Sequence, residues 1–254
     1  MLLIKAGGSV ITRKGPVPVF DRAGAARLGR AMSRLKEPAV LVHGTGSFGK
    51  PPAERYGYLD GRPAPGTAPL AEIKNSLLRL HASLVAELVS GGANAVSCPG
   101  CAYFELASGR PRLRLGKALL DWVRRGFLPV INSDIFPCGS GGFRVVSSDA
   151  LLQSLCAELS PELAVFFTDA PGLLDAAGKV VGSLHRSSLL RFKRELPPSN
   201  ADVSGGMRGK IAEIARINSA GVDAVILDGR RPAELIKLRA GHRIRGTYIH
   251  AQTS

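Results

Sequence analysis

Residues 2–9 read Leu-Leu-Ile-Lys-Ala-Gly-Gly-Ser, a short apolar run that ends in Lys5 and passes into a glycine turn. The run predicts a strand, because Gly7 and Gly8 close it after only a few residues. Glycine lets backbone N–H groups approach a phosphate with no Cβ in the way, and a lysine supplies a positive charge beside them. The same stretch also fits an ordinary strand-to-helix turn.

Short β-type runs alternate with helical patterns along the rest of the chain. Further strands are predicted over residues 39–43, 95–98, 128–131, 163–168 and 224–227. One helix is marked by leucines at steps of three and four residues and by a glycine stop: Leu77, Leu80, Leu84, Leu88 and Gly91-Gly92. This alternation predicts an α/β fold, a three-layer αβα sandwich around a central, mostly parallel sheet.

Three segments interrupt the alternation. A hairpin is predicted over residues 136–146, where Cys-Gly-Ser-Gly-Gly separates two β-type runs. Residues 57–69, rich in glycine and proline, and residues 197–206 are predicted loops. A helix is expected to start near Met207, directly after the second loop.

The composition is that of a globular protein. The chain has 254 residues, of which 45% are apolar and 21% charged, so it can bury a substantial core as a single domain over residues 1–254. No apolar run approaches the roughly 18 residues of a membrane span, and the first one meets Lys5 too soon for a signal peptide. We therefore expect a cytoplasmic protein with no membrane partner.

The formal net charge of +14 favours acidic partners, either nucleic acid or small phosphorylated metabolites. The basic residues are scattered, and aromatic residues make up only 6% of the chain. Proteins that bind single-stranded nucleic acid interleave basic and aromatic side chains to stack the bases. A small anionic metabolite is therefore the expected partner, and nucleic acid is not.

The four cysteines contain one close pair, Cys98-Pro-Gly-Cys101, which could form half of a zinc site or a redox pair. Cys138 and Cys156 do not form a second close pair, and Cys156 lies in an apolar helical run that suits a buried thiol. No metal site is predicted, although the role of Cys98 and Cys101 stays open.

A second glycine turn follows the second predicted strand, where residues 43–50 read His-Gly-Thr-Gly-Ser-Phe-Gly-Lys. The carboxyl ends of strands in open α/β sheets are where ligands bind, and such a turn suits an anion. Gly44 to Lys50 also satisfies the P-loop spacing G-x-x-x-x-G-K. Pro51, however, stands where that motif needs the hydroxyl that holds magnesium, so a P-loop enzyme is not favoured.

Three later segments complete an ordered set with the two glycine turns. They are Ser147-Ser148-Asp149, Thr168-Asp169 with Gly172, and Ser204-Gly205-Gly206-Met207 with Lys210. None is specific alone. In this order the five motifs resemble the amino-acid-kinase superfamily across essentially the whole chain, and within it the isopentenyl phosphate kinases, with the fosfomycin kinases next.

The resemblance implies that two lobes of one domain bind different substrates. Approximately residues 1–160 would bind the acceptor, and approximately residues 161–254 would bind ATP with Mg²⁺. Phosphoryl transfer needs mainly alignment and neutralisation of the charge that spreads over the phosphoryl oxygens. Three lysines would supply that charge and one acid would orient them: Lys5, Lys14, Lys210 and Asp149. A homodimer is also implied by the resemblance.

The other matching positions fall into two sets. Those implied to bind ATP are Gly7, Gly8, Ser9, Thr168, Asp169, Gly172 and Gly206, together with Lys210. Those implied to bind the anionic end of the acceptor are Gly44, Thr45, Gly46, Gly49 and Lys50. No side chain is assigned as a metal ligand.

Two of these residues also have simpler explanations. Lys14, beside Arg13 and Gly15, is typical of a solvated loop charge. Asp149 suits the N-cap of a helix that runs through Leu151. Both explanations stay open at the level of the sequence.

The acceptor side departs from the pattern of the resembling enzymes. Lys50 stands where they carry a histidine, and Thr45 replaces a glycine. A lysine binds phosphate by its charge but lacks the directional contact of an imidazole. Lys74, Leu78 and His81 share one face of a predicted helix, and if that face lines the acceptor pocket, a purely prenyl tail would fit it poorly.

These observations predict an ATP-dependent kinase that transfers the γ-phosphoryl group to a small anionic acceptor. A phosphate monoester such as isopentenyl phosphate is the first candidate, which would place the chain in isoprenoid biosynthesis. A kinase for a different phosphonate or carboxylate, and a non-catalytic sensor of nucleotides or anions, are the alternatives.

Overall fold

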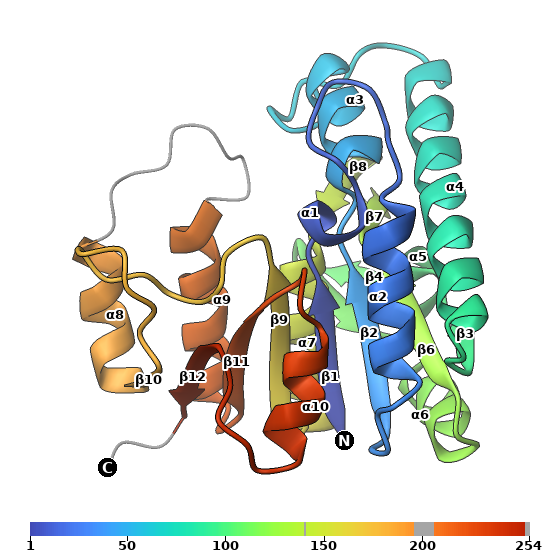
Figure 1. Ribbon diagram of the computed structural model, residues 1–254. Helices are drawn as coiled ribbons and strands as arrows, with labels where there is room; N and C mark the ends of the chain where they lie inside the picture. Colours follow the sequence, from blue (N-terminus) through green and yellow to red (C-terminus); the bar gives the residue numbers. More distant parts are fainter. Residues whose placement is uncertain (140, 196–205, 252–254) are drawn as a thin grey trace.

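The computed structural model describes residues 1–139, 141–195 and 206–251, and its centre is an eight-stranded sheet (Figure 1). The strand order is β10-β12-β11-β9-β1-β2-β6-β3. The bounds are β1 Leu2–Ala6, β2 Ala39–His43, β3 Ala95–Ser97, β6 Leu128–Asn132, β9 Leu163–Thr168, β10 Ser183–His185, β11 Asp223–Asp228 and β12 Gly246–His250. All neighbours are parallel except β11 and β12.

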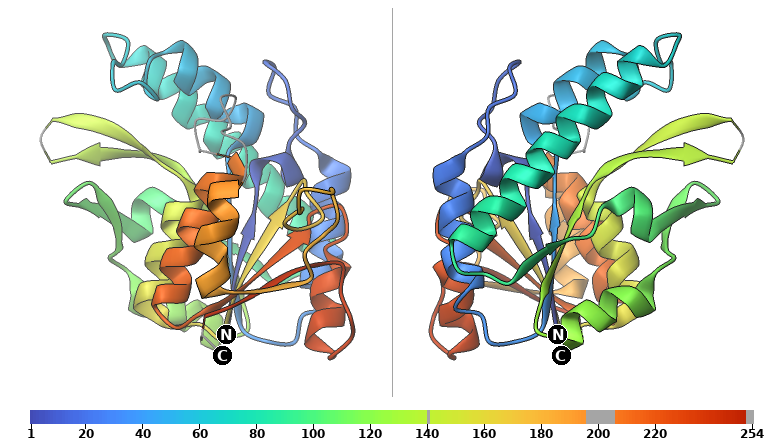
Figure 2. Two further views of the ribbon diagram at one scale, coloured as in Figure 1. Left: turned by 90° about the vertical axis from the view of Figure 1, so that its left-hand side faces the viewer. Right: turned by 90° about the vertical axis from the view of Figure 1, so that its right-hand side faces the viewer.

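Helices cover both faces of the sheet, as Figure 2 shows in edge-on views. One layer consists of α1 Gly8–Ile11, α2 Arg22–Met32, α4 Ala68–Ser90 and α10 Ala233–Arg239. The opposite layer consists of α6 Gly116–Arg124, α7 Ser148–Leu159, α8 Arg186–Glu195 and α9 Gly206–Ser219. The predicted three-layer αβα sandwich with a mostly parallel sheet is therefore confirmed.

Smaller elements complete the chain. Two hairpins, β4 Phe104–Ala107 with β5 Arg110–Leu113 and β7 Asp134–Cys138 with β8 Gly142–Val146, project on the side of α7 (Figure 2). The short helices are η1 Gly46–Phe48, α3 Lys50–Arg55 and α5 Gly100–Tyr103. The hairpin β7–β8 was predicted, whereas β4–β5 was not.

The central strand β1 shows how the sequence builds the layers. Side chains alternate between the two faces of a strand. Leu3 packs into the core beneath α7 and α9, while Leu2 and Ile4 pack into the core beneath α2 and α4. Lys5 continues this alternation on the α7 side and is only 6% exposed, so a charged side chain occupies a core position.

The two predicted loops have different outcomes. Residues 57–67 form turns and irregular structure, and α4 begins at Ala68, close to the predicted end of that loop. Residues 197–205 of the second lie outside the described residues. The helix expected near Met207 is confirmed, because α9 begins at Gly206. Within the described ranges, no helix is both long and apolar enough to cross a membrane.

The connectivity reverses direction at β1. The chain passes from β1 to β2 on one side and later returns to place β9 on the other side of β1. Ligands of open α/β sheets bind at such a switch point, at the carboxyl ends of the strands. The turns after β1, β2 and β9 therefore meet at the edge where a site is expected.

Candidate active site

The glycine turns that follow β1 and β2 are in direct contact. A Cβ added to Gly8 would lie 2.4 Å from the backbone nitrogen of Gly46 and 2.5 Å from its Cα. A Cβ added to Gly44 would lie 2.8 Å from the nitrogen of Gly8. Since no side chain fits between the two backbones, both turns require glycine, and two segments far apart in the sequence converge.

Thr12 joins the two turns through its hydroxyl group. Its Oγ1 donates to the carbonyl of Gly8 at 2.9 Å and accepts from the amide of Ser47 at 3.2 Å. The side chain is buried, and a Cβ on Gly46 would collide with Oγ1. The hydroxyl therefore fixes the distance between the turn after β1 and the turn after β2.

Lys5 forms an ion pair with Asp149 at the start of α7. Lys5 Nζ lies 2.5 Å from Asp149 Oδ2, and both side chains are largely buried. The other carboxylate oxygen, Asp149 Oδ1, is buried and has no hydrogen-bond partner among the described residues. Asp149 is not the N-cap of α7, because the hydroxyl of Ser147 accepts from the Ala150 amide in that role.

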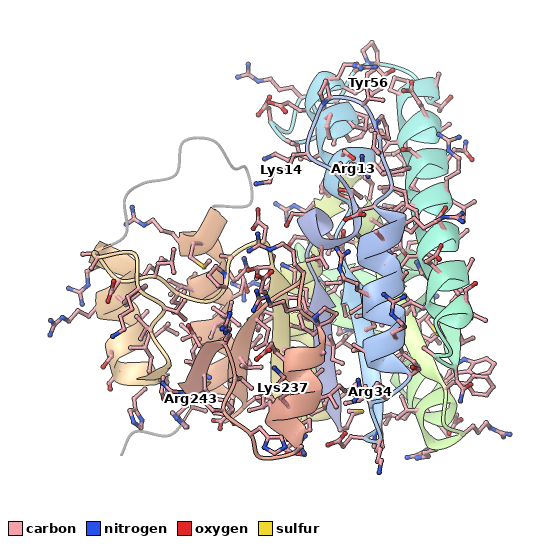
Figure 3. All side chains as sticks on the ribbon, in the orientation of Figure 1. Arg13, Lys14, Arg34, Tyr56, Lys237 and Arg243 are labelled. Atoms are coloured by element: carbon pink, nitrogen blue, oxygen red, sulfur yellow. The ribbon has the colours of Figure 1, made fainter. Side chains whose placement is uncertain are left out.

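Lys14 and Asp169 form a second ion pair at the same edge, with Nζ 2.8 Å from Oδ2. Figure 3 shows Lys14 beside Arg13 on the loop after α1, above the carboxyl ends of the strands. The hydrogen bond from Lys14 lowers the pKa of Asp169; burial opposes this, and the charge of Lys210 adds a smaller lowering. Lys14, Asp169 and Lys210 thus act on one another electrostatically, although they come from three separate motifs.

The ends of β9 and β11 close this side of the site. Thr168 is buried, and its Oγ1 accepts from the Ala170 amide at 3.0 Å, which shapes the turn that carries Asp169. Asp228, the last residue of β11, is buried and accepts hydrogen bonds from both the backbone amide and the guanidinium group of Arg230. Neither Asp228 nor Arg230 was predicted from the sequence, although an acid directly after a predicted strand is a usable signal.

The turn after β2, predicted to bind the acceptor, consists of residues 44–50. Lys50 is partly buried at the start of α3, next to Gly49. A Cβ on Gly49 would lie 2.5 Å from the side chain of Thr45. Thr45, the residue that replaces a glycine of the resembling enzymes, therefore fills the space above Gly49.

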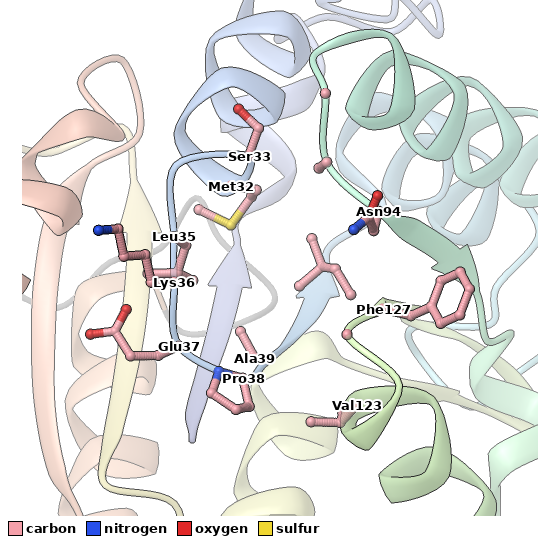
Figure 4. A pocket seen from close by; sticks show the side chains of 14 residues that line it. Met32, Ser33, Leu35, Lys36, Glu37, Pro38, Ala39, Asn94, Val123 and Phe127 are labelled. Carbon is pink, nitrogen blue, oxygen red and sulfur yellow. The ribbon is translucent and has the colours of Figure 1, made fainter.

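The opposite edge of the sheet carries a small cavity of about 180 Å³ (Figure 4). It lies at the amino ends of β2 and β6, and Lys36, Glu37 and Phe127 are among its lining residues. Ligand pockets usually enclose about 300 Å³ or more. Its size and its place at the amino ends of the strands both argue against a role in substrate binding.

The cysteines are all free thiols in the structure, and Cys98 is buried whereas Cys101 is exposed. Burial raises the pKa of both Cys98 and Cys101. In the part of the chain that the structure describes, no group of three or more His, Cys, Asp or Glu residues could hold a metal ion. Among the described residues, no further side chains therefore complete a metal site with Cys98 and Cys101.

The sequence profile of the amino acid kinase family matches residues 1–228. The chain belongs to the amino acid kinase family. It is 29% identical to an isopentenyl phosphate kinase of Methanothermobacter thermautotrophicus and 26% identical to one of Methanocaldococcus jannaschii, each match covering 98% of both chains. A structure described as isopentenyl phosphate kinase superposes with a TM-score of 0.80 at 25% identity, over 98% of this chain and 100% of the other.

The family assignment confirms the resemblance drawn from the five motifs and identifies the chain as a small-molecule kinase. In this amino acid kinase, the predicted site residues lie at one edge of the sheet, at the ends of β1, β2 and β9 and the starts of α7 and α9. The individual role of each residue stays a prediction. Leu78 does not share the inward face predicted for Lys74 and His81, because it is 60% exposed while His81 is buried.

Replacing Thr12 with valine is expected to lower kcat/KM by about tenfold, because valine keeps the shape of the side chain but removes both hydrogen bonds between the turns. Steady-state kinetics with both substrates measures the effect. Thr12→Ser is the matched control, since it keeps the hydroxyl, and should stay close to the unmodified enzyme. A Thr12→Val enzyme as active as the Thr12→Ser enzyme would show that the hydroxyl does not govern the reaction.

Proposed function

We propose that this amino acid kinase transfers the γ-phosphoryl group of ATP to a small phosphate monoester, with isopentenyl phosphate as the first candidate. The observation that supports this most strongly is the contact between Gly8 and Gly46. It brings a turn suited to the phosphates of ATP against a turn suited to a second anion. Relatives named isopentenyl phosphate kinase, aligned over nearly the full length, support the choice of acceptor.

The reaction makes one bond and breaks one bond. An oxygen of the acceptor phosphate attacks the γ-phosphorus of ATP, the bond to the β-γ bridging oxygen breaks, and ADP leaves with that oxygen. A phosphate monoester has a second pKa of about 6, so its oxygen is already ionised near neutral pH. The demand on the protein is therefore to align two anions and to offset their charge.

In this proposal the lysines neutralise the charge of the transferring phosphoryl group. Lys5, held by Asp149, projects from β1 beneath the two turns. Lys14 comes from the loop after α1 and Lys210 from α9, and the charges of both lower the pKa of Asp169. Amides of Gly8 and Ser9, at the start of α1, lack intrahelical partners by position and are available to ATP phosphates.

The carboxylates fit a magnesium ion that arrives with ATP. Mg²⁺ keeps several waters and is usually held by one or two carboxylates together with substrate phosphates. Asp149 Oδ1, buried with no partner among the described residues, and Asp169 are the oxygens that suit it. When bound, Mg²⁺ would neutralise charge on the β- and γ-phosphates.

The remaining assignments follow from the same proposal. Residues 1–160, approximately, would bind the acceptor and residues 161–254, approximately, would bind ATP, with Thr168, Gly172 and Gly206 among the nucleotide contacts. We also propose a cytoplasmic homodimer that acts in isoprenoid biosynthesis, as expected from the family resemblance.

An assay of ADP release with a panel of acceptors tests the function. The panel holds isopentenyl phosphate, other phosphate monoesters, phosphonates and carboxylates, and phosphorus NMR identifies the product. We expect the highest kcat/KM with isopentenyl phosphate and a diphosphate as the product. A folded protein that binds ATP but releases no ADP with any acceptor would contradict the proposal.

Lys50→Ala is expected to raise the KM for the acceptor by about tenfold, because a charged donor to an anion is lost. The KM for ATP should change much less, since Lys50 begins α3 on the acceptor side. Lys50→Arg keeps the positive charge and serves as the control. A rise of similar size in both KM values would place Lys50 between the substrates instead of at the acceptor.

A further inference from the structure

Two buried histidines lie directly behind the turn proposed to bind the acceptor. His43 is the last residue of β2, immediately before Gly44, and His81 lies in the middle of α4. Both side chains are almost fully buried, at 1% and 3% exposure, and their rings are nearly parallel, with centroids 5.2 Å apart. Burying an imidazole costs free energy unless both of its polar ring nitrogens have hydrogen-bond partners.

A chain of three hydrogen bonds links these rings to the turn. His43 Nδ1 lies 3.0 Å from the carbonyl oxygen of Gly44, His43 Nε2 lies 2.9 Å from His81 Nδ1, and His81 Nε2 lies 2.8 Å from Ser97 Oγ. Every ring nitrogen of the pair therefore has a partner. These hydrogen bonds connect β3 through α4 to the end of β2.

The carbonyl oxygen of Gly44 fixes which group donates and which accepts in each of these three hydrogen bonds. A carbonyl oxygen only accepts, so His43 Nδ1 carries the hydrogen and donates to Gly44. In a neutral ring His43 Nε2 must then accept from His81 Nδ1–H, which leaves His81 Nε2 to accept from the hydroxyl of Ser97. The rings are neutral: burial, followed by the charge of His81, lowers the pKa of His43 to about 3, and burial lowers that of His81 to about 4 against the opposing charge of Asp134.

The bond to Gly44 also orients the next amide. In a trans peptide the C=O and N–H groups point in opposite directions, and the described residues contain no cis peptide bond. With the Gly44 carbonyl held toward His43, the N–H of Thr45 points away from the buried pair. Among the described residues, no hydrogen bond has the Thr45 amide as its donor.

We propose that His43, supported by His81, is a positioning residue that holds the Gly44–Thr45 peptide so that the Thr45 amide donates to the anionic group of the acceptor. This inference rests on the proposed function, because it names a donor for the acceptor site of that same reaction. The histidines touch neither substrate. They act by preventing rotation of one peptide group, which would otherwise turn a carbonyl oxygen toward an anion.

Two substitutions of His43 separate positioning from simple packing. In His43→Asn the amide nitrogen takes the place of Nδ1 and can still donate to Gly44. In His43→Gln the amide takes the place of Nε2, next to His81, and the donor to Gly44 is lost. We expect His43→Gln to raise the acceptor KM by about tenfold or more with little change in the KM for ATP, and His43→Asn to stay near the unmodified enzyme.

Parallel losses in both variants, or a KM for ATP that rises as much as that for the acceptor, would overturn the proposal. Nitrogen-15 NMR of the histidine rings in the unmodified enzyme at neutral pH is the second measurement, and it decides the question if His43→Gln does not fold. We expect the hydrogen on Nδ1 of both His43 and His81; an Nε2–H form of His43 would refute the inference. Absence of turnover by the unmodified enzyme would instead count against the proposed function. The NMR measurement would still test the orientation of the Gly44–Thr45 peptide in that case.

Discussion

Replacing Lys5 with methionine is expected to lower kcat by about a thousandfold or more, because in the proposed reaction Lys5 is a preorganised charge that stabilises the transferring phosphoryl group. Methionine resembles the lysine side chain in length and should fill the same space within the sheet. Single-turnover measurements with saturating ATP and acceptor would record the loss. Nucleotide binding should persist, since the glycine turn and the remaining lysines are unchanged.

The same substitution also leaves Asp149 without its ion-pair partner in a largely buried position. Removing one member of a buried pair destabilises a protein more than removing both. The double variant Lys5→Met with Asp149→Asn should therefore recover part of the free energy of unfolding but none of the activity. Recovery of activity in the double variant would mean that Lys5 serves the fold and not the reaction.

A second large effect is expected at Gly8, where alanine should lower kcat/KM by about a hundredfold. The new Cβ would lie 2.4 Å and 2.5 Å from backbone atoms of Gly46, so the two turns must separate. Displacement of substrates by about 1 Å can have an effect of this size. Steady-state kinetics for both substrates, with thermal unfolding to check the fold, would measure it.

Gly182→Ala is the matched control for this experiment. An added Cβ at Gly182 meets no atom within 4 Å, and its backbone is not in the left-handed region. The control should keep both stability and activity. A Gly8→Ala enzyme as active as the Gly182→Ala enzyme would show that the separation of the two turns does not govern the reaction.

The elements of the fold were largely predictable from local patterns. The apolar runs of β1, β2, β6, β9 and β11 are buried on both faces, as parallel strands between two helix layers are, and their composition identifies them. The strands β10 and β12 and the hairpin β4–β5 were missed. β5 is only four residues long and contains Pro111, and proline argues against a strand even though Arg110 and Arg112 alternate with less exposed residues.

The pairing of side chains at the site was not predictable in the same way. His43 and His81 are 38 residues apart, and nothing in either local pattern indicates that their ring nitrogens lie 2.9 Å from each other. Asp149 was assigned by resemblance to orient lysines, and only the structure shows that Lys5 is its ion-pair partner and that Ser147 caps the helix. Such contacts depend on the lateral order of the strands, which the order of residues along the chain does not contain.

By itself, the sequence determined the fold class, the family and the ordered motifs of a kinase, because strand length, glycine turns and charged residues follow from neighbours in the chain. The tertiary structure alone decided that the turns after β1 and β2 touch at Gly8 and Gly46, that Thr12 bridges them, and that His43 meets His81 behind the second turn. The physical reason is that close backbone approach and buried hydrogen bonds arise only when parallel strands bring their carboxyl ends to one edge of the sheet.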